Sequence, residues 1–279
     1  MLKELVNEKW KEAFKARDAA KRSAYEFMKQ FVKTYWKTLV FFTAIGLFGG
    51  FFTGIYLLDS YPAEIAQEIH AQGINDTLMG IIGAVQYAGY GLFLGAIGIW
   101  VAKKIGLWKD ETTITRKPLM AAIVISVIGG LCLILPDILF FGKYSQAILD
   151  SYAVKPTIPY LLATVTIGAV TEEVMLRLFM MSLIAFILHK LFGKKDALPS
   201  TAILIAANVV AALLFAAGHL PATFQMLGNS PILIFRCFLL NGTFGLAFGW
   251  LYRKYGLRYA MIAHGGCHVV SKLIWILFI

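Results

Sequence analysis

Seven long apolar runs restrict what this chain can fold into. They lie at residues 38–58, 77–102, 119–141, 158–189, 201–219, 231–252 and 257–279. Each run can cross roughly 30 Å of hydrocarbon as an α-helix of about 20 residues. The fourth is about ten residues longer than a crossing needs, so it should tilt strongly or project from the membrane. An eighth crossing follows if the stretch around Pro136 divides the third run in two.

The composition excludes a water-soluble fold. Hydrophobic residues make up 59% of the chain and charged residues 15%, and the mean hydropathy is +0.71. Soluble domains are close to half apolar and a quarter charged. In lipid, helices satisfy their own backbone hydrogen bonds, and the loops show no strand-like alternation. We therefore predict an all-α, polytopic transmembrane helix bundle.

The basic residues are distributed very unevenly between the loops. Ten lysines and arginines precede residue 38, and eleven more lie within 103–117, 190–195 and 253–258. The alternate loops contain only Lys143 and Lys155, and the loop 59–76 carries only acidic charges. By the positive-inside rule, we predict a multi-pass protein of the cell membrane with a cytoplasmic N-terminus and an external C-terminus.

The first 37 residues are predicted to form a cytoplasmic juxtamembrane helix ahead of the bundle at 38–279. Their apolar residues recur at roughly helical spacing: Leu2, Leu5, Val6, Trp10, Phe14, Tyr25, Met28, Phe31 and Tyr35. This pattern is typical of an amphipathic helix in the membrane interface, with partner binding as an alternative role. The net charge of +10 is spread over the cytoplasmic loops without interleaved aromatic residues. We therefore expect membrane lipids as partners and no nucleic acid.

Ionisable side chains occur inside the apolar runs of the last 120 residues, although each costs about 2.5–3.5 kcal/mol on insertion scales. The fourth run contains Glu172, Glu173 and Arg177. A glutamate followed by arginine four residues later is the favourable ion-pair orientation, so Arg177 should neutralise Glu173. Glu172 is left without that partner and is a candidate general base. Alternatively, the three side chains form an ion network that only stabilises the bundle.

Three histidines lie within or at the ends of the last spans. His219 follows Phe215 by one helical turn, and His264 precedes His268 by one turn beside two glycines. Each pair therefore shares a helix face, where imidazoles can approach a substrate backbone or a metal. A single histidine at a span end is more often a packing or interfacial residue. The joint pattern with the two glutamates favours chemistry.

These motifs resemble those of the CPBP family of CAAX prenyl endopeptidases and bacteriocin-processing membrane proteins. The motifs, in order, are Glu172-Glu173-x-x-x-Arg177, Phe215-x-x-x-His219 and His264-x-x-x-His268, and the likeness covers about residues 158–270. The resemblance implies an intramembrane endopeptidase that acts on a membrane-associated peptide or lipidated peptide. It further implies that Glu172 activates a water, that His219 assists, and that His264 with position 268 stabilises the oxyanion. Glu173, Arg177 and Phe215 would support them.

One position departs from the family pattern. The last motif usually ends in asparagine, and this chain has His268. A neutral histidine still donates one hydrogen bond to an oxyanion. Glu172, His219, His264 and His268 also form a plausible zinc set, since histidines at i and i+4 are a known metal geometry. The family has been described both as metalloprotease and as glutamate protease, and we favour the metal-free reading with no cofactor.

Two other functions fit parts of the pattern. A non-catalytic scaffold or immunity protein could keep the family fold, and His268 supports that reading. A proton-coupled transporter would also hold charges in its spans, but it should show repeated halves, which are not found. The sequence carries no signal for oligomeric state or for prenylation of the substrate. The side to which the site opens is not set by the residues, and the resemblance implies the cytoplasmic side.

Counted along the predicted helices, the site residues lie at unequal depths. Glu172 and His219 are both about 27 Å from the cytoplasmic ends of their spans, at 1.5 Å per residue. His264 lies only about ten residues beyond Lys254, nearer the cytoplasmic side. Tilted or partly re-entrant helices would be needed to bring the three together.

Overall fold

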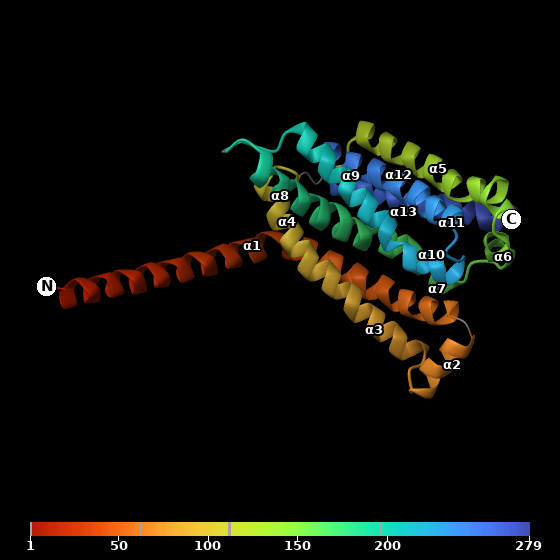
Figure 1. Ribbon diagram of the computed structural model, residues 1–279, viewed down its shortest axis with the longest axis horizontal. Helices are drawn as coiled ribbons and strands as arrows, with labels where there is room; N and C mark the ends of the chain where they lie inside the picture. Colours follow the sequence, from red (N-terminus) through yellow and green to blue (C-terminus); the bar gives the residue numbers. More distant parts are fainter. Residues whose placement is uncertain (1, 62, 111–112, 196) are drawn as a thin grey trace. The chain divides into compact units, whose positions relative to one another are not determined.

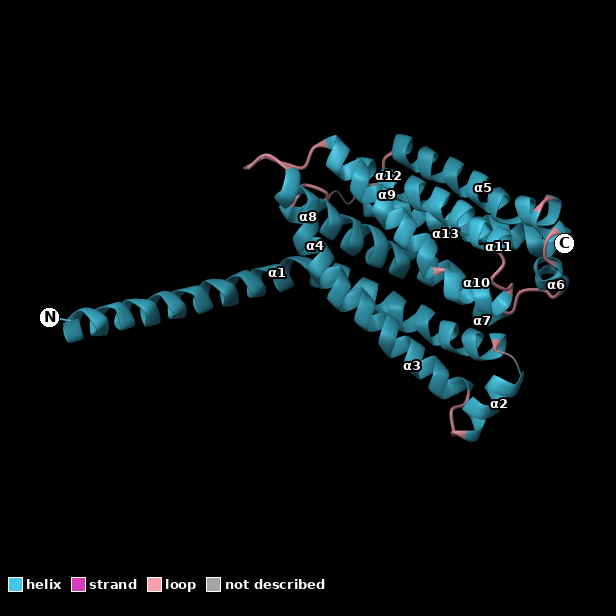
Figure 2. Ribbon diagram, in the orientation of Figure 1, coloured by secondary structure: helices cyan, strands magenta, loops and turns pink. Residues whose placement is uncertain are grey.

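The structure of the protein is a computed structural model that describes residues 2–61, 63–110, 113–195 and 197–279 (Figure 1). The described residues contain helices and loops and no strand (Figure 2). The elements in chain order are α1 (Leu2–Ser60), α2 (Ala63–Ala71), α3 (Asp76–Gly89), η1 (Tyr90–Leu94), α4 (Gly95–Lys104), α5 (Arg116–Leu139), η2 (Phe141–Lys143), α6 (Gln146–Ala153), α7 (Ile158–Thr166), η3 (Ile167–Glu172), η4 (Val174–Met181), α8 (Ser182–Phe192), α9 (Thr201–Gly218), α10 (Leu220–Met226), α11 (Pro231–Cys237), η5 (Phe238–Gly242), α12 (Thr243–Tyr255) and α13 (Leu257–Phe278).

The predicted all-α transmembrane architecture is confirmed. Among the described residues, seven helical segments are long and apolar enough to cross a membrane: Lys15–Ser60, Asp76–Lys104, Arg116–Lys143, Ile158–Phe192, Thr201–Met226, Pro231–Tyr255 and Leu257–Phe278. The eighth crossing considered around Pro136 is not found there. Pro136 lies in the last turn of α5, so it can interrupt only the end of the helix, and Arg116–Lys143 is a single candidate span. The chain is therefore an integral membrane protein with seven candidate spans.

The chain divides into two compact units, Met1–Phe41 and Phe42–Ile279. In the first unit α1 carries a ladder of aromatic rings, with Phe27 and Phe31 centroids 6.2 Å apart and Phe31 and Tyr35 centroids 5.1 Å apart. Several side chains of the predicted amphipathic stripe, those of Leu2, Leu5, Val6, Trp10 and Phe14, lie outside the described residues.

In the second unit, glycines allow helices to approach closely. On α1, Gly46, Gly50 and Gly54 recur every four residues, and a methyl group at any of them would meet the backbone of α3. On α5, a methyl group on Gly130 would meet the side chain of Val270 and the backbone of Ser271 on α13. Small residues at regular spacing are the usual means by which membrane helices pack without a hydrophobic driving force. Figure 1 shows α5, α9, α12 and α13 lying side by side, and these helices surround the site described below.

The fourth span departs from α-helical geometry at the glutamate motif. α7 is followed by two π-helical segments, η3 and η4, with Glu173 between them. π-turns are rare and are frequently found at functional sites. The α-helical geometry expected throughout this span is therefore wrong for residues 167–172 and 174–181.

Candidate active site

The glutamate motif lies on the fourth span, and the residues at the start of that span favour the beginning of a helix. Thr157 caps α7, with its side chain accepting a hydrogen bond from the backbone N–H of Tyr160 (3.4 Å), and Pro159 occupies the first turn. Proline is preferred there because its missing N–H would have no helical partner anyway. From this start the helix runs through η3, which ends at Glu172. The two neighbouring carboxylates therefore lie deep within the span.

Arg177 neutralises Glu173, as predicted. Arg177 Nη1 lies 3.3 Å from Glu173 Oε1, and the two side chains are 1% and 0% exposed. Arg177 Nη2 donates to the Gly245 carbonyl (3.1 Å). The guanidinium also lies over the rings of Phe215 and Phe248, 4.6 and 5.5 Å from their centroids. Aromatic faces attract a desolvated cation, so this charge is held on several sides.

His264 joins the two glutamates from α13. Its Nδ1–H donates to Glu173 Oε1 at 2.8 Å, because a carboxylate oxygen can only accept. In the neutral ring this leaves Nε2 as an acceptor, and Nε2 lies 3.7 Å from Glu172 Oε2. The ring stacks on Phe248 with centroids 4.5 Å apart. Glu173 therefore fixes the tautomer of His264, in the manner of carboxylate–histidine pairs at other sites.

A glycine makes room for both histidines of α13. A methyl group on Gly168 would lie 2.6 Å from His268 Nε2 and 3.4 Å from His264 Nε2. The two rings stack with centroids 5.1 Å apart, which confirms that they share one helix face. His268 Nδ1 is buried without a hydrogen-bond partner among the described residues, as is Glu173 Oε2. Such orphaned polar atoms carry a desolvation penalty, so they mark a place where a ligand or water is expected.

His219 stands at a break between two helices. α9 ends at Gly218, and Pro221 lies in the first turn of α10, where its ring cannot continue the hydrogen bonding of α9. His219 Nδ1–H donates to the Phe215 carbonyl (2.8 Å), and the two rings meet edge to face at 4.7 Å. The predicted one-turn pairing is confirmed. This bond leaves Nε2 of the neutral ring as an acceptor.

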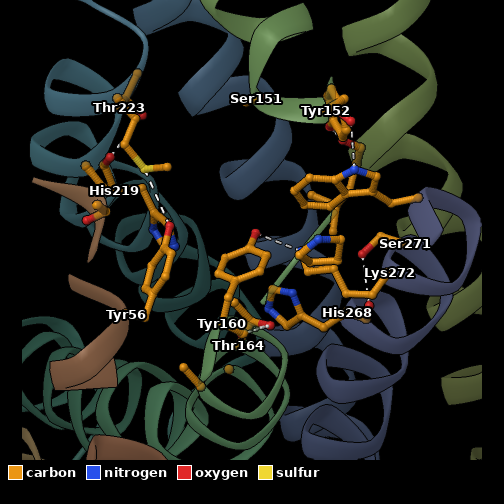
Figure 3. Close-up of a pocket in the computed structure, with 18 of the residues that line it drawn as sticks. Tyr56, Ser151, Tyr152, Tyr160, Thr164, His219, Thr223, His268, Ser271 and Lys272 are labelled. Carbon is orange, nitrogen blue, oxygen red and sulfur yellow. Dashed lines mark hydrogen bonds between the residues drawn. The ribbon is translucent and has the colours of Figure 1, made fainter. Parts of the chain in front are cut away.

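Glu172, His219 and His268 line one cavity of about 610 Å³. Figure 3 shows His219 and His268 on opposite walls of it. The side chain of Glu172 is 26% exposed. His264 does not line the cavity and is only 5% exposed. The structure thus brings Glu172, His264 and His268 together and places His219 on the same cavity.

The unequal depths deduced from the sequence do not keep Glu172 and His264 apart. α13 begins at Leu257, about two turns before His264, directly after Gly256 with φ of 104°. His264 Nε2 nevertheless lies 3.7 Å from Glu172 Oε2.

Sequence reasoning missed several charged residues of the cavity wall. Arg236 forms two hydrogen bonds with the carboxylate of Asp137, and the Tyr152 hydroxyl donates to the same carboxylate (2.9 Å). Burial, reinforced by the Asp137 charge, raises the pKa of Tyr152 above its usual range. Lys272 also lines the cavity. The available signal was the same one that found the glutamates, namely charges inside apolar runs.

The zinc alternative stays a prediction. Within the described ranges, no group of three or more His, Cys, Asp or Glu side chains is arranged to hold a metal ion. His264 and His219 each bond through Nδ1, to Glu173 and to the Phe215 carbonyl, and each keeps Nε2 as an acceptor, an arrangement that histidine ligands of metals also show. We derive no step through a metal.

Comparison with known proteins identifies the segment that holds this site. Residues 154–270 match the sequence model of a family described as Type II CAAX prenyl endopeptidase Rce1-like. This segment is therefore similar to the CPBP family of CAAX-type proteases. No curated protein and no solved structure matches the chain. The matched segment contains all three motifs, so the CPBP likeness and the buried cluster rest on the same residues.

Proposed function

We propose that this protein is an endopeptidase that hydrolyses a peptide bond of a membrane-associated substrate with a water activated by Glu172. The observation that carries the proposal is the placement of the Glu172 carboxylate. It lies on the wall of a cavity shared with His219 and His268, 3.7 Å from a histidine whose tautomer a second glutamate fixes. A carboxylate, imidazoles and a confined water supply are sufficient for peptide hydrolysis.

Glu172 and His264 act on the proton in this proposal. Glu172 takes a proton from the water as its oxygen attacks the scissile carbonyl. His264 Nε2 faces Glu172 with a free lone pair, so it can share that proton before it passes to the leaving amine. Glu173 and Arg177 are positioning residues, because they hold His264 without reaching the cavity. The reaction consumes one water and releases a carboxylic acid and an amine.

His268 supplies the oxyanion contact in this proposal. It lies at the cavity wall, and because its Nδ1 is buried, Nε2 is the ring nitrogen that would donate to the oxyanion. A neutral histidine donates one N–H to developing negative charge, which is worth about 10²–10³ in rate at other oxyanion holes. His264 is less suited to this role, because its one N–H is bonded to Glu173. His219 assists from the opposite wall by accepting a hydrogen bond from water or substrate at Nε2.

The deciding experiment compares peptide cleavage by the purified, reconstituted protein with that of Glu172→Ala and His219→Ala. Fluorogenic peptides with a prenylated Cys-a-a-X tail and without the lipid serve as probes. We expect both variants to lose cleavage while they remain monodisperse after purification. The matched control is Glu68→Gln, which removes an exposed carboxylate from α2 and should cleave like the wild type.

Equal cleavage by all four proteins would defeat the active-site assignment. If the wild type cleaves neither peptide, the scaffold function that His268 suggested from sequence is the better account. A difference between the two peptides would determine whether the substrate carries a lipid.

We propose that substrate enters from the side opposite the basic loops. The cavity is lined by the end of α1 at Asp59, by α6, by the loop before α7, by α10 and by the last turns of α13. All of these adjoin the loops that are poor in lysine and arginine. With the N-terminus cytoplasmic by the positive-inside rule, the cavity opens externally, whereas the family resemblance implied the cytoplasmic side.

Cysteine labelling of intact cells tests this orientation. Ser151→Cys lies at the cavity and Lys195→Cys in the opposite loop, and both positions are exposed. A membrane-impermeant maleimide should label the first in intact cells and the second only after permeabilisation. The parent chain measures the background from its own three cysteines. The reverse labelling pattern would place the cavity on the cytoplasmic side.

A further inference from the structure

One face of α13 forms a wall of the cavity beyond the catalytic histidine. His268, Ser271, Lys272 and Trp275 all line it, at the spacing of neighbours on one helix face. Figure 3 shows His268, Ser271 and Lys272 on this wall, with Tyr160 of α7 facing them. Lys272 therefore lies one helical turn beyond the residue to which we assign the oxyanion contact.

Lys272 has aromatic and hydroxyl neighbours but no acidic partner. Its ammonium donates to the Tyr160 hydroxyl at 2.9 Å and lies 4.6 Å from the centroid of that ring. The Trp275 centroid is 5.7 Å away. An ammonium has three N–H donors, and across the described part of the chain no carboxylate forms an ion pair with this one. The rings fix its position and leave two donors available.

The other cations of the cavity wall are differently placed. Arg236 is neutralised by two hydrogen bonds to Asp137. Lys155 is exposed and donates to the carbonyls of Trp275 (3.4 Å) and Ile276 (3.2 Å) at the end of α13. Lys272 is thus a partly buried charge in the cavity without a counter-ion from the chain. A charge held in a membrane span at such cost usually serves a function.

We propose that Lys272 binds the terminal carboxylate of the peptide substrate and so sets the distance between the scissile bond and the C-terminus. This inference rests on the proposed function. The rise from His268 to Lys272 is about 6 Å along the helix, and the lysine side chain extends the reach further. Two or three residues of extended peptide cover about 7–10 Å. The separation therefore suits a short released fragment.

The test uses two peptides that differ only in their C-terminus, one a free acid and the other an amide. Both are assayed with protein reconstituted in phosphatidylcholine, and the readout is the ratio of kcat/KM for acid over amide. A charge-assisted hydrogen bond predicts a ratio of about ten to a hundred for the wild type. Lys272→Met should reduce this ratio to about one, and Lys272→Arg should keep most of it.

Lys155→Met is the matched control, since it removes a second lysine from the same cavity. The ratio should stay at the wild-type value. Equal cleavage of acid and amide by the wild type overturns the proposal. So does a Lys272→Met protein that slows both peptides by the same factor, because that result describes a lysine that only supports the fold or meets a lipid headgroup.

Failure of the proposed function gives a different result. In that case the wild type cleaves neither peptide, or Glu172→Ala cleaves both as well as the wild type. If cleavage depends on Glu172 but the acid and the amide are cleaved equally well, only the Lys272 inference is wrong. Should Lys272→Met not purify as a folded protein, the acid-to-amide ratio of the wild type and of Lys272→Arg still decides the matter.

Discussion

Two clusters of buried charge lie on the same cavity, and they differ in how completely they are satisfied. In the first, Arg236 and Tyr152 both bond the carboxylate of Asp137. In the second, the glutamates at 172 and 173 meet His264 and Arg177, yet Glu173 Oε2 keeps no partner among the described residues. Glu172 in addition faces the cavity.

The difference indicates which cluster performs chemistry. A pair with every strong bond made is a stabilising element, since any change in its protonation would break those bonds. A cluster with orphaned atoms and an exposed carboxylate has capacity to bind and to exchange protons. The following predictions test that division of roles, from the largest expected effect to the smallest.

Glu172→Gln should remove nearly all activity and leave the fold intact. The amide keeps the shape of the side chain but cannot accept a proton from water, and loss of a general base costs about 10²–10⁴ in rate. Cleavage of a fluorogenic peptide measures the first effect, and the midpoint of thermal unfolding in detergent measures the second. A variant that retains more than a tenth of the wild-type rate would contradict the assignment.

His268→Ala should lower kcat about a hundredfold, because one oxyanion donor is lost. His268→Asn restores an N–H donor and the residue usual in the family, so it should remain within about tenfold of the wild type. KM should change little in either variant. If alanine and asparagine give the same rate, His268 does not contact the oxyanion.

Arg236→Met should affect stability much more than chemistry. It leaves Asp137 as an unpaired buried charge, which typically costs about 3–5 kcal/mol, so the unfolding midpoint should fall clearly. The rate per folded molecule should change less than about tenfold. Adding Asp137→Leu should recover most of the stability. A double variant as unstable as Arg236→Met alone would show that the pair does more than neutralise itself.

Chelation should have the smallest effect. The proposed mechanism uses no metal, so incubation with EDTA followed by desalting should leave kcat/KM within experimental error. Elemental analysis of the purified protein provides the matching measurement. The opposite outcome is stoichiometric zinc, with activity that is lost on chelation and regained when zinc is added. That result would mean that Glu172 and the histidines bind a metal.

The sequence predicted the features that depend on near neighbours in the chain. Apolar runs defined the spans, and spacing of four residues paired Glu173 with Arg177 and Phe215 with His219. Contacts between different spans could not be predicted from the sequence. The His264–Glu173 hydrogen bond joins residues 91 positions apart and the Arg236–Asp137 pair joins residues 99 apart. Periodicity holds no information about such partners, because helix packing alone brings them together.

The π-helical geometry around Glu172 also escaped prediction, and it bears on the surplus length of the fourth span. Ile158–Phe192 contains 35 residues, well above the roughly 20 that a crossing needs. A π-turn closes its hydrogen bonds over five residues instead of four, so more residues fit into each turn and the helix advances less per residue. In η3 and η4 the additional residues therefore widen the helix instead of lengthening it. The reactive carboxylate of Glu172 lies on this wider section of the span.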